Sequence, residues 1–263
     1  MRYDGQYWHY IDKWLLALAR TNHVEEGIRI AKSCFPFFFS SGDGSSSFIK
    51  GGIRWKLSVD GTPPPSLPPT YGPNDDTLNA LIVFSILEKQ NASGLKDNDG
   101  NCTNNTPLSF AKLSLQNEIN LLQQSLSTYH PRVTNDPLGW GLEALFDQFV
   151  MNHPRTEQLR DLAPDALHPS HLSLPFRLYG ALIGARAVSS TDGSGDLVSP
   201  HSLAKLMDLC VHHQLREMKK SFSSRKGSYE EEEHASINRV MLAMALLSPG
   251  VLKRREDDPM VRI

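Results

Sequence analysis

Four carboxylic acids stand at the starts of predicted helices, or in the loop that leads into one, where they could take part in acid–base chemistry. They are Asp60, Asp76, Asp136 and Glu233. Two carboxyl groups that flank a glycosidic bond can act as acid and base in its hydrolysis. Asp and Glu are also common at helix starts because they cap free backbone N–H groups and favour the positive end of the helix dipole. Capping alone accounts well for Asp136, so the sequence leaves open which carboxyl group is acid and which is base.

A second group of residues has side chains that suit a hydroxyl-rich ligand. Tryptophan faces stack on sugar rings, while Arg, His, Lys and Asn hydrogen-bond to hydroxyl groups. The candidate binding residues are His9, Trp55, Lys56, Trp140, Arg177, His234 and Asn238. Helix capping does not explain Trp55, Lys56 or Arg177, whereas His234 is equally well explained as a core histidine. The pattern predicts a carbohydrate or another polar small molecule as the ligand.

Several other kinds of chemistry have no motif in this sequence. There is no G-x-S-x-G nucleophile, no Gly-rich phosphate loop and no H-E-x-x-H zinc motif. Cys34, Cys102 and Cys210 are far apart and odd in number, so neither a disulfide framework nor zinc-ligand spacing follows. We expect no cofactor and no metal. A metal-dependent lyase or cyclase using Asp75–Asp76 is an alternative that requires a second acidic cluster.

The charge balance excludes some classes of partner. The formal net charge is -2, and the basic run 219–226 is followed at once by the acidic run 230–233. Without a basic excess, nothing favours nucleic acid or an anionic membrane. No apolar run approaches the roughly 18 residues of a membrane span, and no signal peptide is visible, so we expect a cytoplasmic protein. The sequence leaves its oligomeric state open.

Apolar periodicity predicts about nine helices and almost no strand. Their ranges are 6–19, 24–39, 77–87, 108–126, 138–150, 156–167, 172–187, 202–219 and 233–247. From the third helix on, helices that are apolar on nearly all sides alternate with helices that are apolar on one side. Only the second kind can face solvent. This alternation predicts a single all-α domain over 1–263, an (α/α) toroid with the odd-numbered helices inside. Polar composition predicts mobile inserts near 91–106 and 189–199. An orthogonal helical bundle is the alternative.

In such a toroid the inner helices all begin at one rim, which would gather the candidate residues around one cavity. The polar, proline-rich segment 51–76 leads into the third helix and would bring Trp55, Lys56 and Asp60 to that rim. Alternation of apolar and polar residues predicts a short extended segment at 53–59. A surface flap over the core is the alternative for this segment.

Five segments resemble an uncharacterised group of six-hairpin, glycosidase-like (α/α) toroid proteins. The segments are DGQYWHYIDKWLLAL, RWKLSVDG, GPNDDTLNALIVF, TNDPLGWGLEALFD and SLPFRLYGALIGA, and the resemblance runs from Asp4 to about Leu247. It implies that fold and, by analogy, a glycan-directed cavity. Two features depart from the group.

The third helix opens with N-D-D-T at 74–77, where the group tends to D-P-L-D-G, which leaves one carboxylate position unmatched. Nine helices also make four and a half hairpins, so we expect a ring that is incomplete at the N-terminus. The resulting prediction is a glycoside hydrolase-like protein that acts on or binds a carbohydrate at the N-terminal rim of the inner helices. The alternative is a non-catalytic toroid that binds a carbohydrate or a protein, and the sequence does not decide whether the protein is an enzyme.

Overall fold

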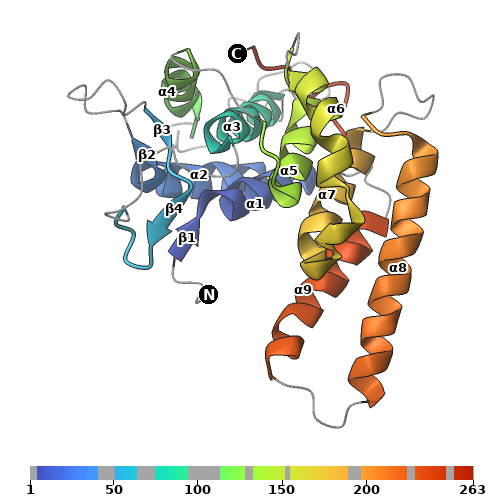
Figure 1. The fold of residues 1–263 in the computed structure, drawn as a ribbon. Coiled ribbons are helices and arrows are strands. Elements are labelled where there is room, and N and C mark those ends of the chain that lie inside the picture. Colours follow the sequence, from blue (N-terminus) through green and yellow to red (C-terminus); the bar gives the residue numbers. More distant parts are fainter. Residues whose placement is uncertain are drawn as a thin grey trace. The chain divides into compact units, whose positions relative to one another are not determined.

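The computed structural model of the protein is mostly helical, which confirms the all-α class (Figure 1). It describes residues 5–40, 51–63, 75–93, 113–127, 133–151, 155–188, 197–223, 229–246 and 252–262. Within these ranges only the backbone is described for residues 220–223 and 229–234. The predicted mobile inserts lie outside the described residues, apart from 91–93 and 197–199.

The described residues contain nine α-helices, one at each predicted place. The helices are α1 Trp8–Arg20, α2 Val24–Phe38, α3 Asp76–Ser93, α4 Gln116–Leu126, α5 Pro137–Asp147, α6 Arg155–Ala166, α7 Pro175–Val188, α8 Pro200–Ser223 and α9 Tyr229–Leu246. A 3-10 helix, η1 Pro169–Ser173, precedes α7. Four short strands complete the described elements: β1 Gly5–Tyr7, β2 Phe39–Ser40, β3 Gly52–Ile53 and β4 Lys56–Ser58.

The chain divides into two compact units. The first unit comprises residues 1–131, 149–151 and 255–263, and the second unit comprises 132–148 and 152–254. Each unit has its own helices and its own buried core, so they are described in turn. The expectation of one domain over 1–263 stays a prediction.

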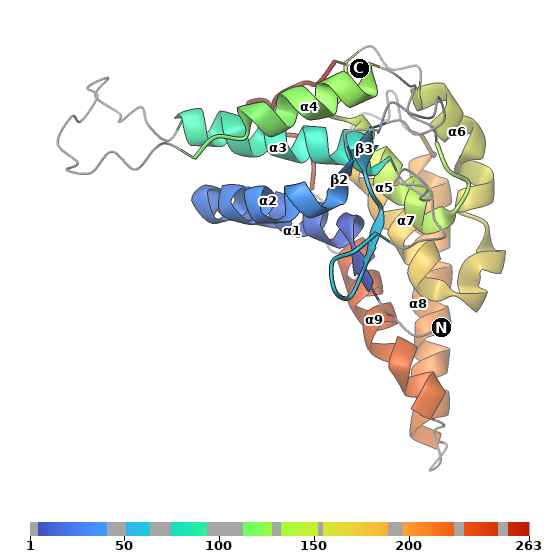
Figure 2. The same cartoon turned by 90° about the vertical axis from the view of Figure 1, so that its left-hand side faces the viewer.

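In the first unit, helices α1 to α4 enclose a core built around α3. The hairpin of α1 and α2 turns at Thr21–His23, where Asn22 adopts a positive φ of 65°, a conformation that Asn tolerates better than most residues. Figure 2 shows α1 beside α2 and α3 beside α4. Between Asp76 and Leu87, every α3 residue except Ser85 is buried. This confirms that α3, apolar almost all round, is an inner helix of its unit.

Two antiparallel strand pairs hold the extended segment against the first unit. Strand β1 pairs with β4, with Gly5 opposite Ser58 and Tyr7 opposite Lys56. Strand β2 pairs with β3. The predicted extended segment at 53–59 is therefore confirmed as parts of β3 and β4.

In the second unit, α5 and α7 run in the same direction and touch backbone to backbone. Asp136 contacts Arg177, Leu138 contacts Gly180, and Gly141 contacts Gly184. Residue numbers rise together along these pairs, so the two helices are parallel. A Cβ on Gly141 would overlap the Gly180 carbonyl oxygen. Glycine is therefore required at this crossing.

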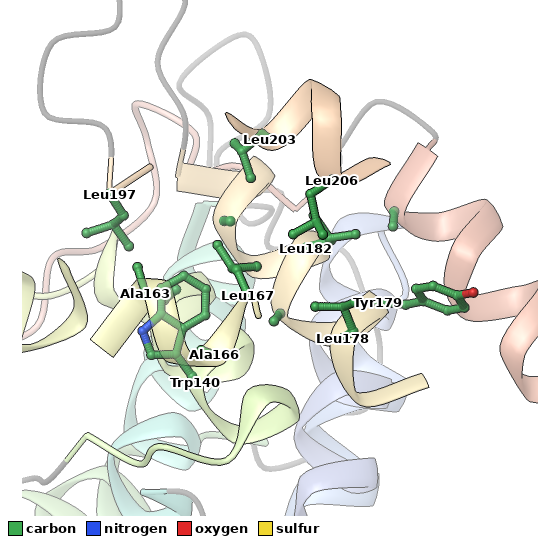
Figure 3. Close-up of a cluster of buried hydrophobic side chains, with 14 of the residues drawn as sticks. Trp140, Ala163, Ala166, Leu167, Leu178, Tyr179, Leu182, Leu197, Leu203 and Leu206 are labelled. Atoms are coloured by element: carbon green, nitrogen blue, oxygen red, sulfur yellow. The ribbon is translucent and has the colours of Figure 1, made fainter. Parts of the chain in front are cut away.

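A hydrophobic core covers the remaining faces of α7. Trp140, Leu178, Tyr179 and Leu182 are fully buried in it, together with apolar residues of α6 and α8 (Figure 3). Helix α9 contributes Leu242 and Ala245. A buried ion pair between Glu143 of α5 and Arg155 of α6 ties the second unit together.

The C-terminal segment 255–262 belongs to the first unit. Both guanidinium Nη atoms of Arg20 donate to the Asp258 carboxylate, at 2.9 and 2.6 Å, and both side chains are buried. Val261 forms a parallel bridge with Val150. None of the described helices has the length and hydropathy of a membrane span.

Candidate functional site

The extended segment 52–58 joins the start of α1 to the start of α3. The amide of Trp8 donates to the carbonyl of Trp55 at 3.0 Å. The amide of Ile53 donates to the hydroxyl of Thr77 at 3.0 Å. The first and third helices of the chain therefore begin against the same segment, and side chains from all three elements meet in the first unit.

Two buried carboxyl groups, Asp12 and Asp76, lie where α1 packs against α3. Asp12 is 0% exposed and Asp76 is 4% exposed. Among the described residues, none of their four carboxylate oxygens has a hydrogen-bond partner. The charge of Asp12 raises the pKa of Asp76, so the two groups are close enough to interact electrostatically. Within the same residues, Asp12 Oδ1 has only an ion pair with Lys13, at 3.7 Å. Native proteins rarely leave buried polar atoms without hydrogen bonds, and such atoms call for a ligand, water or catalytic role.

Burial dominates the protonation of this pair. It raises the pKa of Asp12 to about 6, against the opposing effect of the Lys13 charge. Burial, and then the Asp12 charge, raise the pKa of Asp76 well above its usual range. Two carboxyl groups that interact in a low-dielectric site do not both ionise readily. Ionisation of both groups of the pair is therefore disfavoured.

The amide of Asn79 adds polar atoms beside Asp76. Asn79 is 0% exposed, and neither its Oδ1 nor its Nδ2 has a hydrogen-bond partner among the described residues. The spacing of three residues places it on the same face of α3 as Asp76. Asn79 thus offers an amide donor and an amide acceptor on the face of α3 that carries the Asp76 carboxyl group.

A group of aromatic rings covers the beginning of α1. The Tyr7 ring lies 5.4 Å from the Trp55 ring, 5.5 Å from the His9 ring and 6.0 Å from the Tyr10 ring. The Lys56 ammonium lies 5.2 Å from the centre of the Tyr7 ring. Three predicted binding residues, His9, Trp55 and Lys56, are therefore brought together in the first unit.

His9 is a neutral imidazole in this environment. Burial, helped by the charge of Lys13, lowers its pKa to about 3. Its Nδ1 is buried and has no partner among the described residues. A neutral imidazole can donate one hydrogen bond and accept another, so His9 suits a neutral polar ligand.

Asp60, a predicted catalytic residue, is occupied in a surface turn. Its carboxylate accepts hydrogen bonds from the Thr62 hydroxyl at 2.7 Å and the Thr62 amide at 3.0 Å. These bonds hold its pKa below the usual range. The structure therefore gives Asp60 a local structural role, in which its carboxylate stabilises the turn.

In the second unit, Asp136 and Arg177 meet at the starts of α5 and α7. Asp136 is the N-cap of α5 and accepts from the amide of Gly139 at 3.0 Å. It also forms an ion pair with Arg177. The predicted proximity of these helix starts is observed within this unit, but the carboxylate of Asp136 is already engaged by a cap and an ion pair.

Trp140 occupies the core of the second unit, away from a position where it could stack on a ligand. Its indole Nε1 donates to the Leu159 carbonyl at 2.9 Å, and the residue is 0% exposed. Figure 3 shows the indole among the buried side chains of this core. A side chain without exposed surface has no free face for a sugar ring. In the structure the indole packs within the hydrophobic core of the second unit.

The remaining candidates belong to α9. Asn238 is half-buried, and its Oδ1 has no hydrogen-bond partner among the described residues. The side chains of Glu233 and His234 lie outside the described residues. Because the candidates are divided between two units, a common cavity for all of them stays a prediction.

Sequence analysis missed Asp12 and Asn79, although each leaves a recognisable signal. Asp12 interrupts the apolar stripe that Trp8 and Leu15 form on α1, and Asn79 interrupts the apolar run of α3. A polar residue at a core position is the informative exception to hydrophobic patterning. No group of three or more His, Cys, Asp or Glu side chains suited to a metal occurs among the described residues.

Comparisons of this chain with protein-family models, with curated proteins and with solved structures find no match.

Proposed function

We propose that this protein is a glycoside hydrolase-like enzyme whose acid–base pair is Asp12 and Asp76. The observation that supports the proposal is the burial of two interacting carboxyl groups without hydrogen-bond partners among the described residues. Hydrolysis of a glycosidic bond uses one carboxylic acid that is protonated near neutral pH and one carboxylate. A pair whose environment raises both pKa values and disfavours ionisation of both groups suits that requirement.

Aromatic and polar side chains of the first unit favour a carbohydrate as the ligand. Trp55 and Tyr7 present aromatic rings beside a neutral imidazole and the Lys56 ammonium. Asn79 supplies a buried amide next to Asp76. Rings that stack, together with groups that hydrogen-bond to hydroxyls, are the usual means of recognising a sugar.

We propose further that the helices form an (α/α) toroid of the glycosidase-like kind. Helices α5 and α7 are parallel neighbours connected through α6, which is the repeating step of such a ring. The starts of α1 and α3 meet at one segment, and the starts of α5 and α7 meet at the Asp136–Arg177 ion pair. The resemblance of five sequence segments to six-hairpin glycosidase-like proteins supports the same proposal.

The experiment is a turnover assay of the full chain on aryl glycosides and oligosaccharides of varied linkage. Asp12→Asn and Asp76→Asn should each lower kcat/KM by about 10²- to 10⁴-fold, the range for a general acid or base. Glu26→Gln, on the exposed surface of α2, is the matched control and should keep the wild-type value. Turnover that survives both Asp→Asn substitutions would refute the proposal.

Near-complete burial of both carboxyl groups favours a second candidate, a carbohydrate-binding protein without turnover. Asp12 is 0% exposed and Asp76 is 4% exposed, so water reaches the pair poorly in this conformation. Binding on a glycan array that is lost in Asn79→Ala, without release of sugar from any bound glycan, would support this candidate over the hydrolase.

A further inference from the structure

Lys13 stands at the solvent side of the carboxyl pair and is held there by its own helix. Its Nζ donates to the carbonyl oxygen of His9 at 2.5 Å, one helical turn earlier. The same Nζ lies 3.7 Å from Asp12 Oδ1, an ion-pair distance that is too long for a good hydrogen bond. The Lys13 side chain is 40% exposed, whereas the Asp12 side chain is 0% exposed.

We propose that Lys13 is a positioning residue that gives the two carboxyl groups different roles, keeping Asp12 as the carboxylate while Asp76 carries the proton. The proposal rests on the proposed function, because it divides the acid and base roles of that same pair. It follows from which carboxyl group has the ammonium beside it.

The negatively charged neighbours of Asp76 favour its protonated form. Asp75 precedes it and is anchored by accepting the amide of Leu78 at 3.0 Å. Its negative charge, like that of Asp12, favours the protonated form of Asp76. The Lys13 charge opposes this with an effect smaller than that of Asp12 but larger than that of Asp75. His9 acts on this region as a neutral group. Lys13 favours the ionised form of both groups, but its ion pair is with Asp12, whereas the two negative neighbours of Asp76 favour a proton on Asp76.

This assignment gives each carboxyl group one step in hydrolysis. Asp76 donates its proton to the glycosidic oxygen as the bond from that oxygen to the anomeric carbon breaks. The oxygen of a water molecule forms the new bond to that carbon, and the water releases a proton to Asp12. The pair ends with one proton, now on Asp12, and its return to Asp76 restores the starting state.

The test is a carboxyl ¹³C NMR titration of the unliganded full-length protein. Titrations of an interacting pair belong to both groups, so each carboxyl group is followed alone, Asp12 in Asp76→Asn and Asp76 in Asp12→Asn. We expect Asp12 to titrate at a lower pH than Asp76. Adding Lys13→Gln to Asp76→Asn should raise the Asp12 midpoint by about one pH unit or more, whereas Lys13→Arg should leave it near the starting value.

Lys89→Gln is the matched control, because it removes an equal charge from the exposed surface of α3 and should move neither midpoint. If Lys13→Gln does not fold, Lys13→Arg and the order of the two midpoints still decide the question. A lower midpoint for Asp76 than for Asp12, or an Asp12 midpoint that Lys13→Gln leaves unchanged, would overturn the assignment.

Failure of the assignment can be told apart from failure of the proposed function, because the titration needs no substrate. If the midpoints are as expected but both Asp→Asn variants turn over normally, the enzyme proposal fails and the assignment stands. If the midpoints are reversed while turnover is lost, the pair is catalytic with the roles exchanged.

Discussion

Asp12 of α1 and Asp76 of α3 are both almost completely buried, and the charge of Asp12 raises the pKa of Asp76. Burying an ionisable group without a hydrogen-bond partner destabilises a folded protein. Two such groups side by side are difficult to explain as part of a core that is optimised for stability. Sites arranged for binding or catalysis commonly carry this kind of local destabilisation.

The pair should make stability fall as the pH rises. The folded-state pKa of Asp12 is about 6, above the value of about 3.9 in an unfolded chain. Between these pH values the folded protein therefore binds more protons than the unfolded chain. The contribution of Asp12 to the unfolding free energy is present below about pH 4 and is lost as the pH rises through 6. Asp12→Asn removes this effect.

Relative to wild type, the unfolding free energy of Asp12→Asn should gain about 3 kcal/mol between pH 4 and pH 8. Urea unfolding at several pH values measures the difference, with Glu26→Gln as the control. A difference that does not change with pH would contradict the raised pKa of Asp12.

His9 should impose the opposite dependence on the acid side. Its pKa falls to about 3 on folding, below about 6.5 in an unfolded chain. The contribution of His9 to the unfolding free energy is therefore fully present above about pH 6.5 and is lost as the pH falls toward 3. The imidazole NMR signals of His9 should stay at their neutral positions from pH 8 to pH 4.5. Titration of these signals near pH 6.5 would show that the imidazole is not buried as described.

The Arg20–Asp258 ion pair should contribute strongly to the first unit. Removing one partner of a buried pair leaves an uncompensated charge and costs about 3–5 kcal/mol. We therefore expect Asp258→Ala to lower the unfolding free energy by about that amount in urea. Asp257→Ala, at the exposed neighbouring position, should change it by less than about 0.5 kcal/mol. Equal effects of the two substitutions would mean that the pair is not buried in solution.

The crossing of α5 and α7 should reject any side chain at Gly141 or Gly184. A Cβ at either position would overlap backbone atoms of the other helix, and backbone cannot move aside as a flexible side chain does. We expect Gly141→Ala to lower the unfolding free energy by about 1–3 kcal/mol or more. Ser85→Ala, at a half-buried position of α3, is the comparison. A stable Gly141→Ala protein would contradict the close approach.

The helices were predictable because the spacing of apolar residues along the sequence indicates where each helix lies. Asp136 and Pro137 mark the start of α5, and the apolar run after Asp76 gives α3 its buried length. The short extended segment at 53–59 was predictable from alternation, and the structure has β3 and β4 there. The Arg20–Asp258 pair was not, because its partners are 238 residues apart and neither belongs to a periodic pattern that pairs them.

The candidate site was predictable in part. His9, Trp55 and Lys56 were named from their places at a helix start or in the segment that leads to one, and all three lie around Tyr7. Asp76 belongs to the same unit, and the roles of all four residues stay predictions. Asp12 was missed because it lies in the second turn of α1, away from the helix start. Trp140 was named as a binding residue because a tryptophan near a helix start has the same sequence signal whether it faces a ligand or a core, and the structure buries it completely.

The most direct test of the paired site is the double-mutant cycle of Asp12→Asn and Asp76→Asn on one hydrolysed glycoside. Residues that act as a unit in catalysis are strongly non-additive. Each single variant should lose about 10²- to 10⁴-fold in kcat/KM. The double variant should lose little more than the less active of the two single variants. Losses that multiply in the double variant, or single variants as active as wild type, would show that Asp12 and Asp76 do not work as a catalytic pair.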